Sequence, residues 1–432
     1  MIYLSTPTRL LFKISVQVAL LLITSRAFAN IAKDGNVRER GALCGLIELD
    51  NKQATLAFQP PTQNTDLDDI LELNMSVSEQ AWMDLFRDKT EKEKIRAFPD
   101  NEFVKYPAWK ERWNKWQVAA SNVIKPGGRQ AALAKHKLKD ITPEQEAAIR
   151  PAIQRLAAEA AAIADHMQET APPENLINDS DLQQKLNEAI YGDPAGADTP
   201  SDASKLFKGA ANGAGPQASC EGDTTTNKAV TVTAALLCVC TNKDGASNDE
   251  GKACEYVTGT TQSWTGSTDY PNAAAISEAV KLRDLQTKHH VSAETLAAKI
   301  GAVTSLIRRV SGAATFGKTI NGGCTGSQDG GMCVKYSDLG NDGSKKYTDI
   351  PWLRQVAELV TSLRAHEKAV QVRHQAANAI MTMRLQAQSL IYSESPQARE
   401  QMQPKTGIPE KKINAKECEQ HKNNKTACTE AN

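Results

Sequence analysis

The sequence predicts a mainly α-helical fold: an elongated helical bundle or antiparallel coiled coil that carries a disulfide-bearing head with a small β-hairpin. Two long stretches, 142–170 and 350–393, have apolar residues at alternating spacings of four and three, which is the repeat of a coiled coil. The insertion between them is rich in glycine and cysteine, a composition typical of a cross-linked head. After residue 417, a short cysteine-bearing fragment predicts the start of a small cysteine-rich C-terminal domain.

The first long stretch has its own start and stop signals. Thr142 and Gln145 form a capping-box pair, and Pro143 suits the first helical position. Pro151 should kink the first turns, because its nitrogen cannot donate a backbone hydrogen bond. Two prolines after Ala171 end the pattern. The apolar seam consists of Ile149, Ile153, Leu156, Ala160, Ile163 and Met167.

The second long stretch can be the partner of the first. Neither proline nor glycine interrupts the chain between Pro351 and Ser393. At ~1.5 Å per residue, such a helix is on the order of 60 Å long. Its apolar stripe comprises Leu353, Val356, Val360, Leu363 and Val370. His366 and His374 lie along this helix at a spacing that does not suit one metal ion, so we expect both to be solvated.

The charge balance gives no indication of a nucleic-acid-binding protein. The chain of 432 residues contains 51 Lys+Arg and 51 Asp+Glu. Residues 1–29 predict a secretory signal peptide, with basic residues before an apolar run and a small-x-small cleavage site that ends at Ala29. Cleavage there removes three basic residues and no acidic one, which leaves 48 basic against 51 acidic residues. Neither a nucleic-acid footprint nor a basic membrane-binding patch follows from that balance.

Export would place the cysteines in an oxidising compartment, where thiols normally form disulfides. The disulfide candidates are Cys44, Cys220, Cys238, Cys240, Cys254, Cys324, Cys333, Cys418 and Cys428. Cys324 and Cys333 are close in sequence across a glycine-rich segment, so we expect them to bond to each other. Residues 30–417 hold an odd number of cysteines. At least one of them is therefore free, or pairs outside this region or with another chain.

Four of these cysteines allow a second interpretation. A strand through Cys238 and Cys240 would place both sulfurs on one side of a sheet. Together with Cys220 and Cys254, they could then form a four-thiolate zinc site. Because exported thiols are normally oxidised, we favour disulfides and predict no metal or cofactor.

The remaining segments predict shorter elements. We expect a helix at 31–50, a long surface excursion at 172–218, a β-hairpin at 229–258, and helices at 272–288 and 292–310. The aromatic stripe formed by Trp109, Trp113 and Trp116 could be a carbohydrate or other ligand platform, but we interpret it as bundle core. We expect the glycine-rich segments 192–271 and 312–345 to form the exposed head.

No motif predicts an enzyme. Gly312–Thr319 matches the phosphate-binding pattern G-x-x-x-x-G-K-[ST], but the sequence predicts neither the preceding strand nor the following helix that this chemistry needs. Asp338, Asp342 and Asp349 imitate a calcium loop, but Gly340 occupies a position that needs an oxygen ligand. We interpret that segment as a capped turn. The sequence contains no nucleophile elbow, paired catalytic carboxylates or zinc-protease motif.

Three asparagines match the acceptor pattern for N-glycosylation: Asn74, Asn178 and Asn424. Asn424 is the strongest candidate, because it lies between two cysteines in a small polar fragment. Asn178 follows, in a proline-bounded segment.

The order of several segments resembles the variant surface glycoproteins of trypanosomes with a type B N-terminal domain. The resemblance rests on Gly41–Leu46, Leu237–Cys240, the Cys324 and Cys333 segments that lead into Ile350–Leu353, and Asn424–Thr429. It implies a signal peptide at 1–29, an N-terminal domain at 30–396, a linker at 397–417 and the beginning of the C-terminal domain at 418–432.

This resemblance also implies a function. Such proteins are expected to stand on the plasma membrane by a glycolipid (GPI) anchor, as homodimers in a dense coat. The coat shields the parasite, and replacement by other variants evades host antibodies. The chain stops at Asn432 before an anchor signal, so we expect a truncated sequence. The alternative is a surface receptor on the same helical scaffold, which would bind a host serum protein or nutrient in a shaped site of the head.

Overall fold

The chain folds into two compact units. The computed structural model describes residues 30–393 except 51–53, 63–64, 92–93, 100–101, 104, 197–201, 210–214, 244–252, 255–263, 265–269, 281–287, 311, 321 and 341–343. Unit 1 comprises Met1–Pro61 and Gln168–His374, and unit 2 comprises Thr62–Met167 and Gln375–Asn432. The predicted signal peptide, linker and C-terminal fragment lie outside the described residues.

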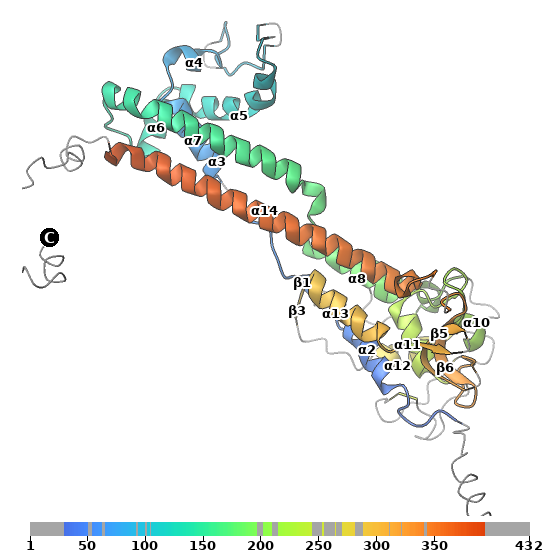
Figure 1. Ribbon diagram of the computed structural model, residues 1–432. Helices are drawn as coiled ribbons and strands as arrows, with labels where there is room; N and C mark the ends of the chain where they lie inside the picture. Colours follow the sequence, from blue (N-terminus) through green and yellow to red (C-terminus); the bar gives the residue numbers. More distant parts are fainter. Residues whose placement is uncertain are drawn as a thin grey trace, which may run out of the picture. The chain divides into compact units, whose positions relative to one another are not determined.

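Unit 2 is helical in its described part. Its elements are α3 (Asp66–Ser76), α4 (Gln80–Asp84), α5 (Pro107–Ile124), α6 (Gly128–Lys135), most of α7 (Pro143–Thr170) and the last part of α14 (Pro351–Ser393). Within this unit, α7 and the last part of α14 lie side by side and antiparallel (Figure 1). Ile149, Ile153 and Leu156 of α7 share one hydrophobic cluster with Ile380 and Ala387 of α14. The two long helices predicted from the heptads are therefore confirmed.

The start of α7 follows the predicted capping box. The Thr142 backbone N–H donates to Gln145 Oε1 at 3.0 Å, and the Gln145 backbone N–H donates to Thr142 Oγ1 at 3.3 Å. Two backbone donors that the first helical turn leaves without helical partners are thereby satisfied. Pro151 lies inside α7, as the sequence indicates.

An aromatic cluster fills unit 2 between α4 and α5. Trp113 is fully buried and stacks on Phe86 with ring centroids 4.5 Å apart. Trp82 meets Trp109 and Trp116 edge to face, at 5.3 and 5.4 Å. This geometry is favoured by the quadrupoles of the rings. The interpretation of the stripe as core is correct for Trp113, whereas Trp109 and Trp116 are only half-buried.

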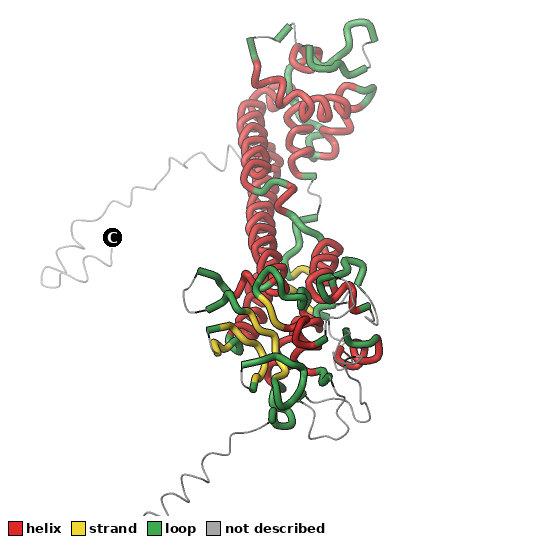
Figure 2. Tube along the Cα trace, turned by 90° about the vertical axis from the view of Figure 1, so that its right-hand side faces the viewer, coloured by secondary structure: helices red, strands yellow, loops and turns green. Residues whose placement is uncertain are grey.

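Unit 1 combines short helices with two small sheets (Figure 2). Its helices are α2 (Val37–Ile47), η1 (Pro173–Asn175), α8 (Asp179–Tyr191), α9 (Ala203–Leu206), α10 (Pro216–Cys220), α11 (Val232–Cys240), α12 (Ala273–Val280), α13 (Ala293–Thr304), η3 (Tyr347–Asp349) and the first part of α14. Its strands are β1 (Ala54–Leu56), β2 (Glu221–Gly222), β3 (His289–Val291), β4 (Arg308–Val310), β5 (Ala313–Thr319) and β6 (Gly331–Tyr336).

The larger sheet has the strand order β2-β6-β5-β4. β5 pairs antiparallel with both β6 and β4, whereas β2 pairs parallel with β6. In the smaller sheet, β1 and β3 pair parallel. The core forms around α11, which packs against α2, α8, α12 and the larger sheet. At the start of α14, the buried Trp352 joins this core and donates through Nε1 to Tyr336 Oη at 2.8 Å.

Several predicted elements of unit 1 are wrong in type or extent. The segment 172–218 is not a mere surface excursion, because it contains α8, whose Leu182 and Leu186 are buried in the core. The helix predicted at 292–310 ends at Thr304, and the chain then turns into β4. The predicted hairpin at 229–258 is replaced by helix α11. Of its return strand, Cys254 lies in a bend and the rest falls outside the described residues.

The antiparallel hairpin of this fold lies instead in the glycine-rich segment, where β5 and β6 pair. The residues that match a phosphate-binding loop form β5, so their backbone groups take part in strand pairing rather than cradling a phosphate. Gly317 is needed in this strand because its φ is +97° and a Cβ would lie 2.6 Å from Met332 O. Both strands are largely buried. The expectation that all of 312–345 is exposed is therefore wrong.

Candidate functional site

Helix α11 directs its two cysteines to opposite sides of the helix, within the core of unit 1. Every residue of α11 is buried, and Thr231 caps its start by accepting from the Ala234 backbone N–H. On a helix, residues two apart point about 200° away from each other. Cys238 therefore bonds to Cys220 on one side, and Cys240 bonds to Cys254 on the other, with Cα–Cα distances of 5.8 and 5.2 Å.

These bonds decide between the two interpretations of the four cysteines. The predicted strand is wrong, because Val232–Cys240 forms the helix α11. Cys238 and Cys240 therefore do not face the same side. All four sulfurs are consumed in disulfides, so no thiolate remains for zinc. Among the described residues, no group of three or more potential ligands could hold a metal ion.

The third disulfide closes the connection between strands β5 and β6. Cys324 bonds to Cys333 of β6, the pairing expected from the sequence, with a Cα–Cα distance of 5.0 Å. The Cys324 backbone N–H donates to Glu221 Oε1 at 2.6 Å. Because Glu221 belongs to β2, this bond ties the turn to the edge of the sheet.

Cys44 is the unpaired cysteine of the described residues. It lies on α2 and is partly buried. Burial raises the pKa of its thiol; Arg40 opposes this effect and Glu48 adds to it. The thiol is therefore mostly protonated and unreactive at neutral pH. Cys418 and Cys428 lie outside the described residues.

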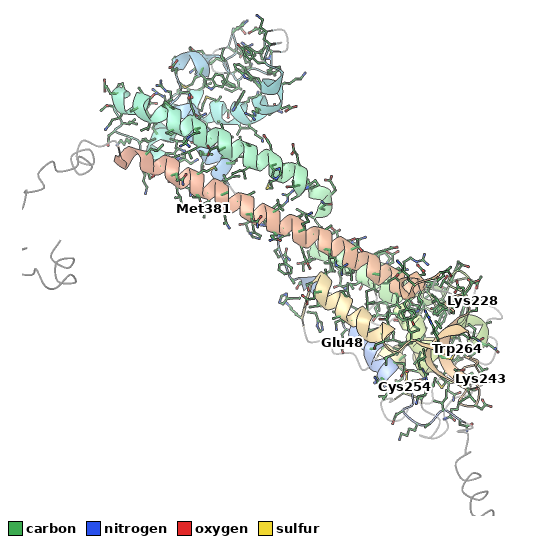
Figure 3. The ribbon with its side chains drawn as sticks, viewed as in Figure 1. Glu48, Lys228, Lys243, Cys254, Trp264 and Met381 are labelled. Carbon is green, nitrogen blue, oxygen red and sulfur yellow. A yellow bond between two sulfur atoms is a disulfide. The ribbon has the colours of Figure 1, made fainter. Side chains whose placement is uncertain are left out.

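Asn36 connects three segments of unit 1 and was not singled out from the sequence. Its buried side chain donates through Nδ2 to Val239 O and Met332 O, both at 2.9 Å. Its Oδ1 accepts from the Lys318 backbone N–H at 2.9 Å. An asparagine before a helix suggests an N-cap, but this side chain makes no capping bond. It instead links the start of α2 to α11, β5 and β6, and Cys254 Sγ lies 3.8 Å from Asn36 O (Cys254 is labelled in Figure 3).

The two histidines of α14 differ in their exposure to solvent. His366 is fully buried, so the expectation that it is solvated is wrong. Its Nδ1 accepts from the Ile177 backbone N–H at 3.2 Å, and its Nε2 lies 2.9 Å from Phe58 O. This arrangement needs the neutral ring with its proton on Nε2. His374 is exposed, as expected, and contacts Gln59 O at 3.0 Å.

The segment that imitates a calcium loop is engaged in protein contacts. Asp338 accepts from the backbone N–H and hydroxyl of Thr224, at 2.9 and 2.6 Å, and pairs with Lys345 at 3.0 Å. Burial opposes ionisation of Asp338, but these partners together hold its pKa below the usual value. Asp349 accepts from the Lys346 backbone N–H, which fits the predicted capped turn, and Asp342 lies outside the described residues.

The two described sequons have different surroundings. Asn178 is exposed and caps α8: its Oδ1 accepts from the Asp181 backbone N–H at 2.9 Å. Asn74 lies in the last turn of α3 and is half-buried. Asn424 lies outside the described residues. Among the described helices, none is both long and apolar enough to cross a membrane.

Comparison with known proteins agrees with this architecture. Residues 18–382 match the family described as Trypanosomal VSG domain. The chain is also similar to the variant surface glycoprotein ILTAT 1.23 of Trypanosoma brucei brucei, with 28% identity over 427 residues, which cover 96% of this chain and 78% of the relative. The chain therefore belongs to the trypanosomal variant surface glycoproteins, a family of surface coat glycoproteins that mediate antigenic variation.

Proposed function

We propose that this chain is a non-catalytic coat protein that is GPI-anchored and homodimeric, and that unit 1 presents its variable antigenic surface. The carrying observation is the position of the disulfides. They join Cys220 at the end of α10, and the loop residues Cys254 and Cys324, to the buried α11 or to β6. Exposed turns next to these bonds can change in sequence while the core stays closed, because the covalent links do not depend on the turn residues.

The turn at 223–226 illustrates such a surface. Thr225 and Thr226 are exposed, and the Asp223 carboxylate accepts from both of their backbone N–H groups, at 2.7 and 2.8 Å. Thr224 is buried and holds Asp338. The hydroxyls of Thr225 and Thr226 also bond to Asp223, at 2.6 and 3.0 Å, but both side chains are exposed. Substitutions at these two positions therefore change the surface of the turn without entering the core.

Antibody escape tests this assignment. Antibodies raised against intact cells should select substitutions at exposed turn positions such as Thr225, and not at Thr233 of α11, which is buried. Escape substitutions that fall mainly on the described surface of unit 2 would contradict it. A receptor function would instead give saturable binding of a host serum protein to the purified domain.

The dimer proposal has support on the surface of α14. Met381 and Leu385 are 40% and 50% exposed, and they lie one helical turn apart on one face. Figure 3 labels Met381 on this helix. Burying such a pair against a second copy removes apolar surface from water. We expect Met381→Lys with Leu385→Lys to weaken the dimer in sedimentation analysis, whereas Thr361→Lys, at an exposed position of α14 several turns away, should leave it unchanged.

The anchor is tested on cells. Phospholipase C that is specific for phosphatidylinositol should release the protein from the surface. Retention after this treatment, with a known GPI-anchored protein released in the same sample, would contradict the anchor and leave the antigenic assignment standing.

A further inference from the structure

A cavity of about 250 Å³ opens in unit 2 next to a glycosylation sequon. Trp82 and Trp116 form part of its wall, and Ala157 and Ala161 of α7 form another part. The small alanine side chains leave the space that the two indole rings border. Its volume lies below the roughly 300 Å³ at which pockets for drug-sized ligands begin, so it suits a group of about one sugar ring.

Asn74 also lines this cavity. Its Oδ1 is buried and has no hydrogen-bond partner. Its Nδ2 makes no hydrogen bond to a described residue either. Asn74 therefore borders the cavity with an amide nitrogen that is not engaged by a described residue and can carry a substituent. In the sequon Asn74-Met75-Ser76, this nitrogen is the one that accepts a glycan.

We propose that Asn74 carries an N-linked glycan whose first N-acetylglucosamine occupies this cavity. This inference rests on the proposed coat glycoprotein and specifies which site holds the sugar. In the reaction, Nδ2 loses a proton and bonds to C1 of the sugar, and the lipid pyrophosphate that carried the glycan leaves. No oxidant or reductant is needed. Ser76 is buried in the folded protein, so the proposal requires that transfer occur before the chain folds.

The cavity provides the contacts that a sugar ring needs. Aromatic faces pack against the C–H faces of sugars, and Trp82 and Trp116 are half-buried with their rings edge to face at 5.4 Å. Arg112 and Gln154 add polar donors at the wall for the acetamido carbonyl and the hydroxyls. Arg112 is exposed and forms no ion pair with a described residue, so its guanidinium is available. The sugar would cover aromatic surface that is otherwise open to water.

Glycopeptide mapping and fluorescence of the intact protein, purified from a eukaryotic host, test the proposal. We expect the Asn74 peptide to carry a glycan. Trimming it with an endoglycosidase to one N-acetylglucosamine should leave the tryptophan emission and the Tm unchanged. Asn74→Gln, which prevents attachment, should shift the emission to the red and lower the Tm. Trp116→Leu should lower the Tm more in the glycosylated protein than in the Asn74→Gln background.

Each alternative outcome contradicts a different statement. An unmodified Asn74 with sugar on Asn178 or Asn424 overturns this inference and leaves the glycoprotein proposal intact. Three unmodified asparagines overturn both. Asn74 could instead carry a glycan while Asn74→Gln changes neither the tryptophan emission nor the effect of Trp116→Leu. The sugar would then project into solvent, which overturns the proposal that it occupies the cavity.

Discussion

Unit 1 contains three disulfides, two of which bond the buried helix α11 to neighbouring segments. The described part of unit 2 contains no cysteine; long helices and stacked aromatic rings form its core. Most helices of unit 1 are short, and α9 and α10 have four and five residues. Helices of this length are unstable alone, because nucleation costs more than a few hydrogen bonds return. In unit 2, α5 and α7 have 18 and 28 residues and a continuous apolar side. Covalent closure is thus used where local structure is weakest.

A charged residue placed in the core of one unit should destabilise that unit more than the other. Leu363 is fully buried in the core of unit 1, and Leu156 is 5% exposed in the core of unit 2. We expect Leu363→Asp and Leu156→Asp each to lower the free energy of unfolding by more than about 4 kcal/mol, because each buries an unpaired carboxylate. Hydrogen exchange measured by mass spectrometry should show the loss first in the unit that carries the substitution.

The exposed Leu385 gives the control for this pair. Leu385→Asp should change stability of the isolated chain by less than about 0.5 kcal/mol, as expected for a surface position. Equal loss of protection in both units, from either core substitution, would mean that they unfold as one and would remove the basis of the comparison.

The aromatic cluster is expected to be the main support of unit 2. Trp113→Ala removes a fully buried ring and its stacking on Phe86, which should cost about 3–5 kcal/mol. Denaturant unfolding would measure this loss. Val118→Ala on the same helix is the control, because Val118 is 55% exposed and should matter little. A similarly small effect of Trp113→Ala would show that the cluster does not stabilise the unit.

The disulfides should affect unit 1 alone. Replacing Cys240 and Cys254 together by serine opens a bond that spans 14 residues, which should cost about 3 kcal/mol by the chain-entropy argument. Exchange should become faster around α11 and remain unchanged along α7. Cys44→Ser is the matched control, since Cys44 makes no disulfide in the described chain. Faster exchange along α7 in the double variant would contradict the independence of the units.

The smallest expected effect is a pH dependence in unit 2. Burial is the main reason that the pKa of His136 lies below the usual histidine value of 6.5; Glu72 opposes this shift and Lys135 adds to it. The unfolded chain therefore binds the proton more readily than the folded one, so unit 2 loses stability as the pH falls below about 6.5. His136→Gln should reduce this slope, measured as Tm against pH, whereas His374→Gln at an exposed site should not. An unchanged slope in His136→Gln would assign the pH dependence to other groups.

The hydrophobic pattern alone was sufficient for the two longest helices. The heptads of α7 and α14 put apolar residues on one side of an otherwise polar helix, and local signals such as Thr142 and Pro143 mark where α7 begins. The pairing of Cys324 with Cys333 could also be inferred, because a short glycine-rich segment brings them together. These features depend on residues that are close in the sequence, so the sequence alone predicts them.

The centre of unit 1 was decided by the tertiary structure. Val232–Cys240 is apolar on all sides because it is buried on all sides, so it has no periodicity that distinguishes a buried helix from a buried strand. That choice determines whether Cys238 and Cys240 face the same or different partners. The environments of Asn36 and His366 depend on backbone groups far away in the sequence, at Val239, Met332 and Ile177. Such partners leave no local pattern, because backbone carbonyls and amides are present at nearly every residue and the sequence of the partner does not mark them.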